Sequence, residues 1–424
     1  MKLKPQNIFY GWYIVASGLV ITVLQGGLYV YGFGAFYTPF LNSFGATRAQ
    51  VAGVLSLTRL EGGLIAPVAG FLIDKYGPRR LMLFGLSMMG LGFVLLSRAS
   101  NLFMLYAVFV VMATGSSFGS ARPVQVALAN WFIRRRGRVM GLLMTGFGIG
   151  GSLVFVVAWL IDTFGWRSAA VISGVTIWVV GLPLSLLVRH KPEDMGLLPD
   201  GEQPNSPNVD QSKELNGNRE NISETEVDLE ENFTARQALK TRAFWMLVLV
   251  YGAWSILPPT LSVHQFAFLQ EEVGISYSEA GLWVSAFSFV SLFGRVSVGW
   301  ISDYINPRYL LAILYVLMGV GMLLMSTVHS NWQILLYILV MAPAYGGSIP
   351  LRPTIQGYFF GRESFGTIGG LLQFFDLPVT VASPVFVGYI ADVWDYRLGF
   401  QIVAGFVALG ALFVLAAHPP KHRD

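Results

Sequence analysis

The chain has 424 residues, of which 54% are hydrophobic and only 12% are charged, and its mean hydropathy is +0.58. Soluble domains carry about 25% charged residues, so this composition excludes a water-soluble globular protein. The absence of cysteine excludes disulfides and thiolate metal sites, and the net charge of +4 gives no indication of nucleic-acid binding.

Apolar stretches of about 20 residues recur along the chain, and each is long enough to cross a bilayer as a helix. They lack the period-two alternation of a transmembrane β-barrel. We predict an all-α membrane protein with twelve transmembrane helices in two pseudo-symmetric six-helix bundles. The spans are predicted to begin near Tyr10, Arg48, Arg80, Leu102, Arg138 and Ser168 in the first half, and near Thr241, Ser278, Arg308, Trp332, Gly366 and Arg397 in the second.

Charged residues beside these spans indicate an orientation. No small-residue cleavage site follows residues 1–6, so we expect an uncleaved first helix. One side of the spans holds only Arg48, Arg98, Arg167 and Arg397. The other side holds Lys2, Lys4, Lys75, Arg79, Arg80, Arg134, Arg135, Arg136, Arg138, Arg189, Lys191, Arg308, Arg362, Lys421 and Arg423. Positive charge marks the cytoplasmic side, so we expect an inner or plasma membrane protein with both termini in the cytoplasm.

The composition changes between the two halves. Residues 200–231 are rich in Asn, Ser, Pro, Glu and Asp and hold almost no large apolar residues. Such a segment cannot bury enough apolar surface to fold. We therefore predict a first bundle over residues 1–189, a flexible cytoplasmic linker over 190–240 and a second bundle over 241–424. Thr234 is expected to cap a short helix before the seventh span.

The second half of the chain repeats the first at a spacing of about 230 residues. Residues 70–74 (G-F-L-I-D) match residues 299–303 (G-W-I-S-D), and the Arg-Pro pair at 122–123 matches the pair at 352–353. Two copies of one hydrophobic unit are typical of transporters in which two halves move around a central site. The repeat therefore favours a transport function.

The turn between the second and third spans carries a motif, G-x-x-x-D-K-x-G-x-R-R, at residues 70–80. An aspartate here can accept hydrogen bonds from a helix N-terminus, and arginines can bind groups at neighbouring helix ends. The motif resembles the signature loop of the major facilitator superfamily, and residues 299–308 repeat it without the Lys and the second Gly. The resemblance implies a cytoplasmic gate, for which we predict Asp74, Lys75, Arg79, Arg80, Asp303 and Arg308.

A second resemblance is to monocarboxylate transporters and oxalate/formate exchangers. It rests on N-W-F-I-R-R-R at residues 130–136, F-G-W-R at 164–167 and Y-G-W at 10–12. Arg295 lies in the segment where monocarboxylate carriers place a substrate-binding arginine, so the resemblance implies that Arg295 holds a carboxylate. The acidic residue that those carriers often have one turn earlier is Ser291 here, so their Arg–Asp proton-coupling pair is not carried over.

Charged residues also fall inside the predicted spans. Each arginine at a helix centre costs about 2.5–3.5 kcal/mol on insertion, so these side chains should face water, a partner or a ligand. The arginines are Arg59, Arg122, Arg295 and Arg352, and the carboxylates are Glu61 and Asp376. Pairing with both acids still leaves two positive charges, which favours an anion, and a guanidinium group fits a carboxylate geometrically.

Several of these residues have two interpretations. Arg122 and Arg352 serve either as structural or gate residues near the cytoplasmic ends of their spans, or as substrate contacts. Glu61 and Asp376 either pair with arginines or carry a proton. The Pro-Pro pair at 258–259 should break or kink the seventh span. The histidine after it is either a packed hydrogen-bonding residue or a functional one, as a substrate contact or a proton relay. The substrate-binding candidates are Arg295, Arg59, Arg122 and His264, with Glu61 and Asp376 as proton-coupling candidates and Arg352 as a gate candidate.

The chain has no nucleotide-binding loop and no paired-histidine metal motif, so we expect no enzyme activity, catalytic residue, cofactor or metal. We predict a secondary active transporter that moves a small organic anion, above all a monocarboxylate, by alternating access through proton symport or anion exchange. The expected partners are the anion, protons and the lipid bilayer, with no nucleic acid, and the expected functional unit is a monomer. The alternatives are an exporter of amphipathic compounds with the same fold and a non-transporting membrane sensor.

Overall fold

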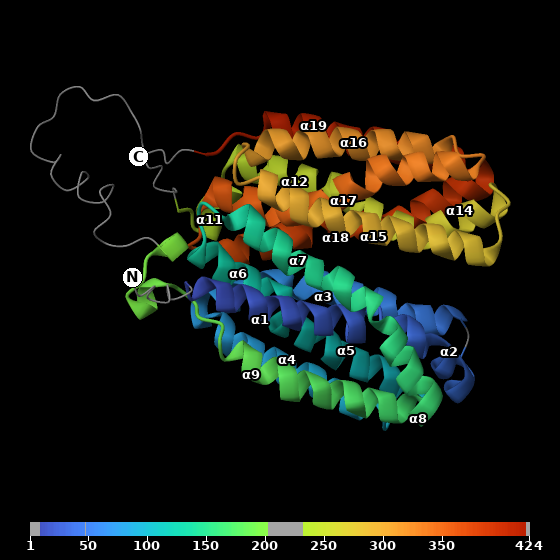
Figure 1. The fold of residues 1–424 in the computed structure, drawn as a ribbon, viewed down its shortest axis with the longest axis horizontal. Coiled ribbons are helices and arrows are strands. Elements are labelled where there is room, and N and C mark those ends of the chain that lie inside the picture. The colour runs from blue at the N-terminus through green and yellow to red at the C-terminus, as the bar shows by residue number, and fades with distance from the viewer. Residues whose placement is uncertain (1–8, 47, 202–231, 421–424) are drawn as a thin grey trace, which may run out of the picture.

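A computed structural model describes residues 9–46, 48–201 and 232–420 of the chain. The regular elements within these ranges are all helical, and they form two bundles that lie side by side (Figure 1). Most of the polar segment that was predicted to link the bundles falls outside the described residues. Helix α1 begins, and helix α19 ends, at the same end of the molecule (Figure 1).

The first bundle contains the chain up to residue 201. Its elements are α1 (Gly11–Leu24), η1 (Gln25–Val30), α2 (Phe33–Phe44), α3 (Arg48–Tyr76), α4 (Pro78–Leu96), α5 (Leu102–Gly119), α6 (Ala121–Trp131), α7 (Arg136–Ser152), α8 (Val154–Thr176), η2 (Ile177–Gly181) and α9 (Leu182–Ser185). Its buried core runs from Ile14 to Val188 and also takes in Phe365 from the other bundle.

The second bundle has the same plan. Its elements are α11 (Ala235–Leu239), α12 (Arg242–Ser255), α13 (Leu257–Thr260), η6 (Leu261–Gln265), α14 (Phe266–Glu271), α15 (Tyr277–Ile301), α16 (Pro307–Ser326), α17 (Asn331–Phe360), α18 (Phe365–Val393) and α19 (Tyr396–Ala416). Its core runs from Phe233 to Ala417. Helix α11 begins with a capping box in which the Thr234 and Gln237 side chains each accept from the other's backbone N–H, as expected for a cap at Thr234.

The helices account for twelve membrane crossings. Eleven segments of the described chain are long and apolar enough to span a membrane, and one of these, Arg136–Ser185, is 50 residues long. A single crossing needs only about 20 residues. Gly165 interrupts the helical path of this segment with a φ of 77°, so one crossing precedes it and another follows it. The prediction of an all-α protein with twelve spans in two bundles is confirmed.

Two spans are broken near the middle. The fourth span breaks at Ser120, whose φ of −117° and ψ of −139° are not helical, and α6 starts at the next residue. The seventh span is interrupted around Pro258 and Pro259, as predicted, and continues through the π-helical turn η6. Helix α17, in contrast, runs unbroken through Pro350 and Pro353. The two Arg-Pro pairs of the repeat therefore sit in different backbone settings.

The bundles contact each other mainly along two helix pairs, α3 with α18 and α7 with α15, and also where α7 meets α17 and α6 meets α18. Gly141 on α7 allows one of these close approaches, because a Cβ atom there would lie 2.6 Å from the backbone oxygen of Arg295 on α15. Such close approaches at small residues are common between membrane helices. On the outer faces, apolar side chains such as Phe103 and Leu282 are exposed, as expected for helices that face lipid.

Both ends of the linker region are attached to equivalent turns of the repeat. Asp200 accepts hydrogen bonds of 2.9 Å from the backbone N–H groups of Ile133 and Arg134, just before α7. Asn232 accepts from the backbone N–H groups of the equivalent turn at residues 362–363, at 2.9 and 3.3 Å, just before α18. The internal repeat thus extends to the segments that flank the linker.

Candidate functional site

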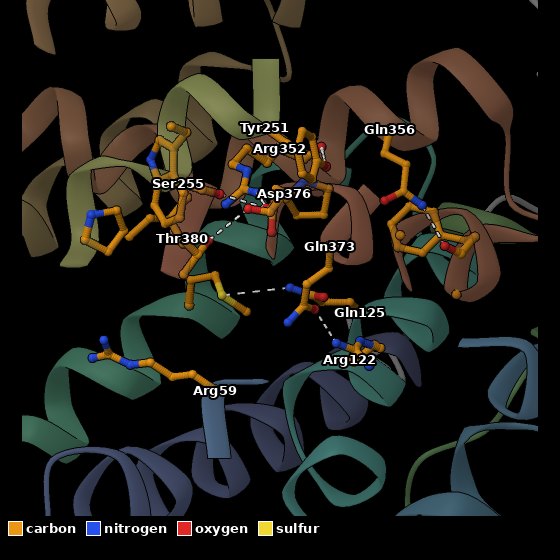
Figure 2. Close-up of a pocket in the computed structure, with 18 of the residues that line it drawn as sticks. Arg59, Arg122, Gln125, Tyr251, Ser255, Arg352, Gln356, Gln373, Asp376 and Thr380 are labelled. Atoms are coloured by element: carbon orange, nitrogen blue, oxygen red, sulfur yellow. Dashed lines mark hydrogen bonds and ion pairs between the residues drawn. The ribbon is translucent and has the colours of Figure 1, made fainter. Parts of the chain in front are cut away.

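A cavity of about 450 Å³ lies between the two bundles. Helices α3, α6 and α7 of the first bundle line it together with α12, α13, η6, α17 and α18 of the second (Figure 2). Its charged and amide-bearing lining residues are Arg59, Arg122, Arg352, Asp376, Gln125, Gln356 and Gln373. Three arginines and one carboxylate leave the lining with a net charge of +2, so the cavity is suited to a negatively charged solute.

Arg352 on α17 is held by side chains of its own bundle. Its Nη2 lies 3.1 Å from Oδ2 of Asp376 on α18, and that oxygen also accepts a 2.8 Å hydrogen bond from the Ser255 hydroxyl. The guanidinium lies between the rings of Tyr251 and Trp254, 4.0 and 4.2 Å from their centroids. An ion pair combined with two cation–π contacts makes this arginine a fixed part of the cavity wall.

Arg122, the repeat counterpart of Arg352, has neutral partners. Its Nη2 donates to Oε1 of Gln373 on α18 (Figure 2). Its Nη1 donates to the backbone oxygen of Ala66 at 3.5 Å. Gln125, three residues further along α6 and hence on the same face, places its amide nitrogen 3.9 Å from the sulfur of Met144. A thioether is a weak acceptor, so this wall of the cavity keeps hydrogen-bond donors available to a ligand.

Arg59 is the third cavity arginine, and its side chain is exposed on α3. Within the part of the chain that the structure describes, it makes no hydrogen bond or ion pair. Figure 2 places it on the same side of the cavity as Arg122 and opposite Arg352. The two positive charges that Asp376 does not neutralise therefore both come from the first bundle.

The other predicted substrate contacts lie outside the cavity lining. Arg295 is 7% exposed, and its Nη1 donates to the backbone oxygen of Met144 at 2.9 Å across the bundle interface. His264 is buried, with Nε2 2.8 Å from the backbone oxygen of Pro384. The structure therefore brings Arg59 and Arg122 together at one cavity and leaves Arg295 and His264 in packed positions. Substrate contact by the latter two stays a prediction.

The two proton-coupling candidates occupy different environments. Asp376 lines the cavity in the ion pair with Arg352. Glu61 lies outside the cavity lining, where its Oε1 accepts a 2.8 Å hydrogen bond from the Thr114 hydroxyl. Its Oε2 is buried and has no hydrogen-bond partner among the described residues. A buried carboxylate oxygen without a donor is costly when charged, so the environment of Glu61 is compatible with proton binding.

Two aspartates from the repeated loop motif join the bundles at one end. Asp74, at the end of α3, accepts from the N–H of Gly366 at 2.9 Å and from the N–H and hydroxyl of Thr367 at 2.7 and 2.6 Å. Asp303 accepts from the N–H of Arg138 at 3.2 Å and lies 3.2 Å from its Nε. Each carboxylate thus caps the start of a helix in the opposite bundle, α18 or α7, where the helix dipole favours negative charge.

A third connection lies at the same end. Arg362, in the turn before α18, lies 2.6 Å from Glu193 and donates a 3.0 Å hydrogen bond to the backbone oxygen of Asn130. Both partners belong to the first half of the chain. Together with the two aspartate caps, this contact holds the bundles together at the end where α1 begins and α19 ends.

The remaining gate candidates make no cross-bundle contact of this kind. Lys75 lies over two aromatic rings of its own helix. Arg79 and Arg80 make no hydrogen bond or ion pair within residues 9–46, 48–201 and 232–420. Arg308 donates to backbone oxygens at the end of α19, within its own bundle. Arg352 lies in the cavity wall. Gate roles for all of the candidates stay predictions. Asp74 and Asp303 are the candidates that contact the opposite bundle in the described chain.

The contact between Asp303 and Arg138 should respond to pH. Burial raises the pKa of the Asp303 carboxyl to about 6 despite the hydrogen bond and positive charge from Arg138. Separation of the bundles would hydrate this carboxyl and return its pKa towards the usual 3.8. The closed arrangement then has the higher pKa, so it binds the proton more tightly and is favoured as the pH falls through about 6.

This expectation can be measured at the gate itself. Since the chain has no cysteine, a single Ser302→Cys variant gives a thiol at a buried position beside Asp303. Its labelling rate, divided by that of the unfolded protein at the same pH to correct for thiolate content, should fall on acidification below about pH 6. Adding Asp303→Asn should weaken this dependence. A normalised rate that rises as the pH falls would contradict the sign argued here.

Several cavity residues were not anticipated from the sequence. They are the three glutamines and the Tyr251, Trp254 and Ser255 side chains that surround the ion pair. The repeat carried a signal for two of them, because Gln125 follows its Arg-Pro pair by two residues and Gln356 follows the equivalent pair by three. Gln373 had no such signal, since its partner Arg122 lies 251 residues away in the chain.

Two helical bundles embedded in the membrane, with a charged cavity between them and paired contacts that join them at one end, are the architecture of a membrane transporter. The family comparison identifies the family of transporters. The model of the Major Facilitator Superfamily matches residues 18–268 and 243–424, and the chain belongs to this family. It is therefore an integral membrane protein that handles a small-molecule substrate, and not an enzyme.

Curated relatives of the chain carry two kinds of transporter name. The chain is 24% identical over 389 residues to a probable hexose phosphate transport protein of Chlamydia pneumoniae, covering 88% of the chain and 83% of that protein. It is 25% identical to monocarboxylate transporter 12 of Xenopus laevis, with 95% and 87% coverage. Human monocarboxylate transporter 2 is 23% identical, with 99% and 87% coverage. The resemblance to monocarboxylate transporters is thus confirmed at the level of relatives.

Solved structures agree on the fold. The proton:xylose symporter XylE superposes with a TM-score of 0.75 at 13% identity, covering 96% of this chain and 95% of that one. The human organic anion transporter MFSD10 superposes with a TM-score of 0.69 at 14% identity, covering 97% and 100%. At these identities the likeness concerns the fold alone.

Proposed function

We propose that this protein is a secondary active transporter of a small organic anion, with monocarboxylates as the first candidate substrates. The observation that carries the proposal is the cavity between the bundles, where three arginines face one carboxylate. A guanidinium group on a low-dielectric wall binds a carboxylate through charge-assisted, often bidentate hydrogen bonds. The names of the monocarboxylate transporter relatives support the same substrate class.

The proposed mechanism is alternating access. The positive-inside distribution of Lys and Arg places the end with the Asp74 and Asp303 caps in the cytoplasm. The conformation described here then has its cytoplasmic end held shut by these contacts. Release of the anion to the cytoplasm requires these cross-bundle contacts to break and the bundles to rock around the cavity. We place both chain termini in the cytoplasm and the protein in the cell membrane, as a monomer.

Glu61 and Asp376 are the residues that we propose for proton coupling. The buried, unpartnered oxygen of Glu61 and the ion pair of Asp376 with Arg352 both give protonation a structural consequence. Protonation of Asp376 would release Arg352 towards the cavity, and protonation of Glu61 would relieve a buried charge. Proton symport requires at least one of these carboxyls, whereas anion exchange requires neither.

A sugar phosphate is the second candidate cargo. Two arginines, Arg59 and Arg122, lack a carboxylate partner among the described residues, and a phosphomonoester carries up to two negative charges at neutral pH. One of the relatives is named for hexose phosphate transport. Export of amphipathic compounds is a competing function, and it would draw on the aromatic side chains of Tyr251 and Trp254 rather than on the arginines.

Uptake into proteoliposomes tests these functions. We expect saturable uptake of lactate, pyruvate or oxalate, with glucose 6-phosphate as the second arm. If the coupling is symport, an inward proton gradient should stimulate uptake, and Glu61→Gln or Asp376→Asn should abolish the stimulation. Loss of uptake in Arg295→Ala would support the substrate role that the family resemblance implies. Unchanged uptake in this variant would remove Arg295 from the substrate site. Absence of uptake for every anion, together with movement of an amphipathic dye, would contradict the anion proposal.

A further inference from the structure

The repeat supplies two equivalent arginines to the cavity, but only one of them is chemically available. Arg352 is held by the carboxylate of Asp376 at 3.1 Å and by two aromatic rings. Arg122 has no carboxylate partner among the described residues, and it donates a hydrogen bond to the neutral side chain of Gln373. An anion approaching Arg352 would have to displace a carboxylate, whereas one approaching Arg122 would have to displace only an amide.

The backbone adds to this difference. The fourth span breaks at Ser120, so Arg122 stands in the first turn of α6, where the helix dipole is positive. Arg352 stands deep within the 30-residue helix α17, away from either helix end. A cation at the positive end of a helix dipole is unfavourable by itself and is compensated when an anion binds there. Gln125, on the same face of α6, supplies a second donor.

We propose that Arg122 is the residue that anchors the anionic group of the substrate, and that Gln373 occupies its place in the empty carrier. The proposal rests on the proposed function, namely that the cargo is an anion. The amide oxygen of Gln373 stands where a substrate oxygen would bind Nη2 of Arg122. Binding exchanges a neutral acceptor for a charged one, and charge-assisted hydrogen bonds are roughly twice as strong as neutral ones.

The exchange also links binding to movement of the bundles. Arg122 belongs to α6 of the first bundle and Gln373 to α18 of the second, so their hydrogen bond connects the two bundles at the cavity. A substrate that displaces Gln373 breaks this hydrogen bond between the bundles. Gln373 thus acts both as a competitor that sets the affinity for the anion and as a contact that is released when the anion binds.

The decisive variant is Gln373→Glu, which keeps the size of the side chain and puts a carboxylate opposite Arg122. Arg122 then acquires the neutralised state that Arg352 already has. We expect the dissociation constant for pyruvate, measured by calorimetry on purified protein, to rise by about 30-fold or more, because losing one partner of a buried charge pair costs about 2 kcal/mol or more and 1.4 kcal/mol is tenfold. Gln373→Met, which frees Arg122, should bind pyruvate at least as tightly as the parent protein.

Controls separate this assignment from a general charge effect. Ser262→Asp adds the same charge to the cavity wall on η6 of the second bundle and should weaken binding less than Gln373→Glu does. Arg352→Gln should alter pyruvate affinity less than Arg122→Gln does. If Gln373→Glu binds pyruvate like the parent, or no more weakly than Ser262→Asp, Arg122 is not the anchor and the proposed function still stands. If the parent binds none of pyruvate, oxalate or glucose 6-phosphate, both proposals fall.

Discussion

Replacing Asp376 with alanine should destabilise the protein by about 3–5 kcal/mol, the cost of removing one partner from a buried ion pair. The carboxylate is the only acidic partner of Arg352 in the described chain, at 3.1 Å, and both side chains are largely buried. Without it, the guanidinium remains between two aromatic rings with its charge uncompensated. The apparent Tm of the detergent-purified protein, read by intrinsic fluorescence, should therefore fall clearly below that of the parent.

The double variant Arg352→Met/Asp376→Leu tests whether the loss of stability comes from the uncompensated charge of Arg352. It removes both charges and fills a similar volume with apolar groups, and such exchanges of a buried pair are often neutral or stabilising. We expect it to recover most of the stability lost in Asp376→Ala. Asp392→Ala, at an exposed carboxylate on α18, should change stability by no more than about 0.5 kcal/mol. A Tm for Asp376→Ala equal to that of Asp392→Ala would show that the ion pair contributes nothing to stability.

Replacing Asp74 with alanine should open the end of the protein that carries the two aspartate caps. Its carboxylate accepts three hydrogen bonds from the start of α18 in the other bundle. A hydrogen bond to a charged group contributes about 1.5–3 kcal/mol, and 1.4 kcal/mol is tenfold in population. Loss of all three should shift the conformational equilibrium at least about tenfold towards the state that is open at this end.

The shift can be read with a single thiol. Val126→Cys, a conservative change at a buried residue that lines the cavity, introduces the sole cysteine of the chain. A membrane-impermeant maleimide applied from the side of the aspartate caps should label it faster when Asp74→Ala is added. Lys75→Ala is the matched control, because within the described residues the Lys75 ammonium lies over rings of its own helix and forms no ion pair with the other bundle. Equal labelling rates in the Asp74→Ala and Lys75→Ala proteins would exclude Asp74 as a gate.

The two sets of variants act on different parts of one cycle. Asp376 stabilises the cavity wall within the second bundle, whereas Asp74 stabilises one arrangement of the two bundles relative to each other. A transporter needs both kinds of contact, since the bundles must stay rigid while the interface between them changes. Asp376→Ala should therefore lower stability without favouring either conformation. Asp74→Ala should favour one conformation without lowering the stability of either bundle.

Much of the architecture could be derived from the order of residues alone. The second-half helices α12, α15, α16, α17, α18 and α19 begin within about one residue of the predicted positions. The length of an apolar run is a local property that the bilayer thickness converts directly into a span. The helix break near Pro258 and the paired aspartates of the loop motif could also be predicted from the sequence. A proline and a repeated motif are visible in the sequence even when the residues that they contact are unknown.

The roles of the cavity residues depended on which helices meet. Arg122 and Arg352 occupy identical Arg-Pro pairs, yet one contacts a glutamine and the other an aspartate. Both partners lie on α18, where Gln373 contacts the first bundle and Asp376 contacts a helix of its own bundle. Arg295, for which the family resemblance implies a substrate role, donates to a backbone oxygen of the opposite bundle in this conformation. Hydrophobic length and helix breakers act within a single segment and can be read along the chain, whereas the charge state of a cavity is set by side chains from distant segments whose meeting only packing decides.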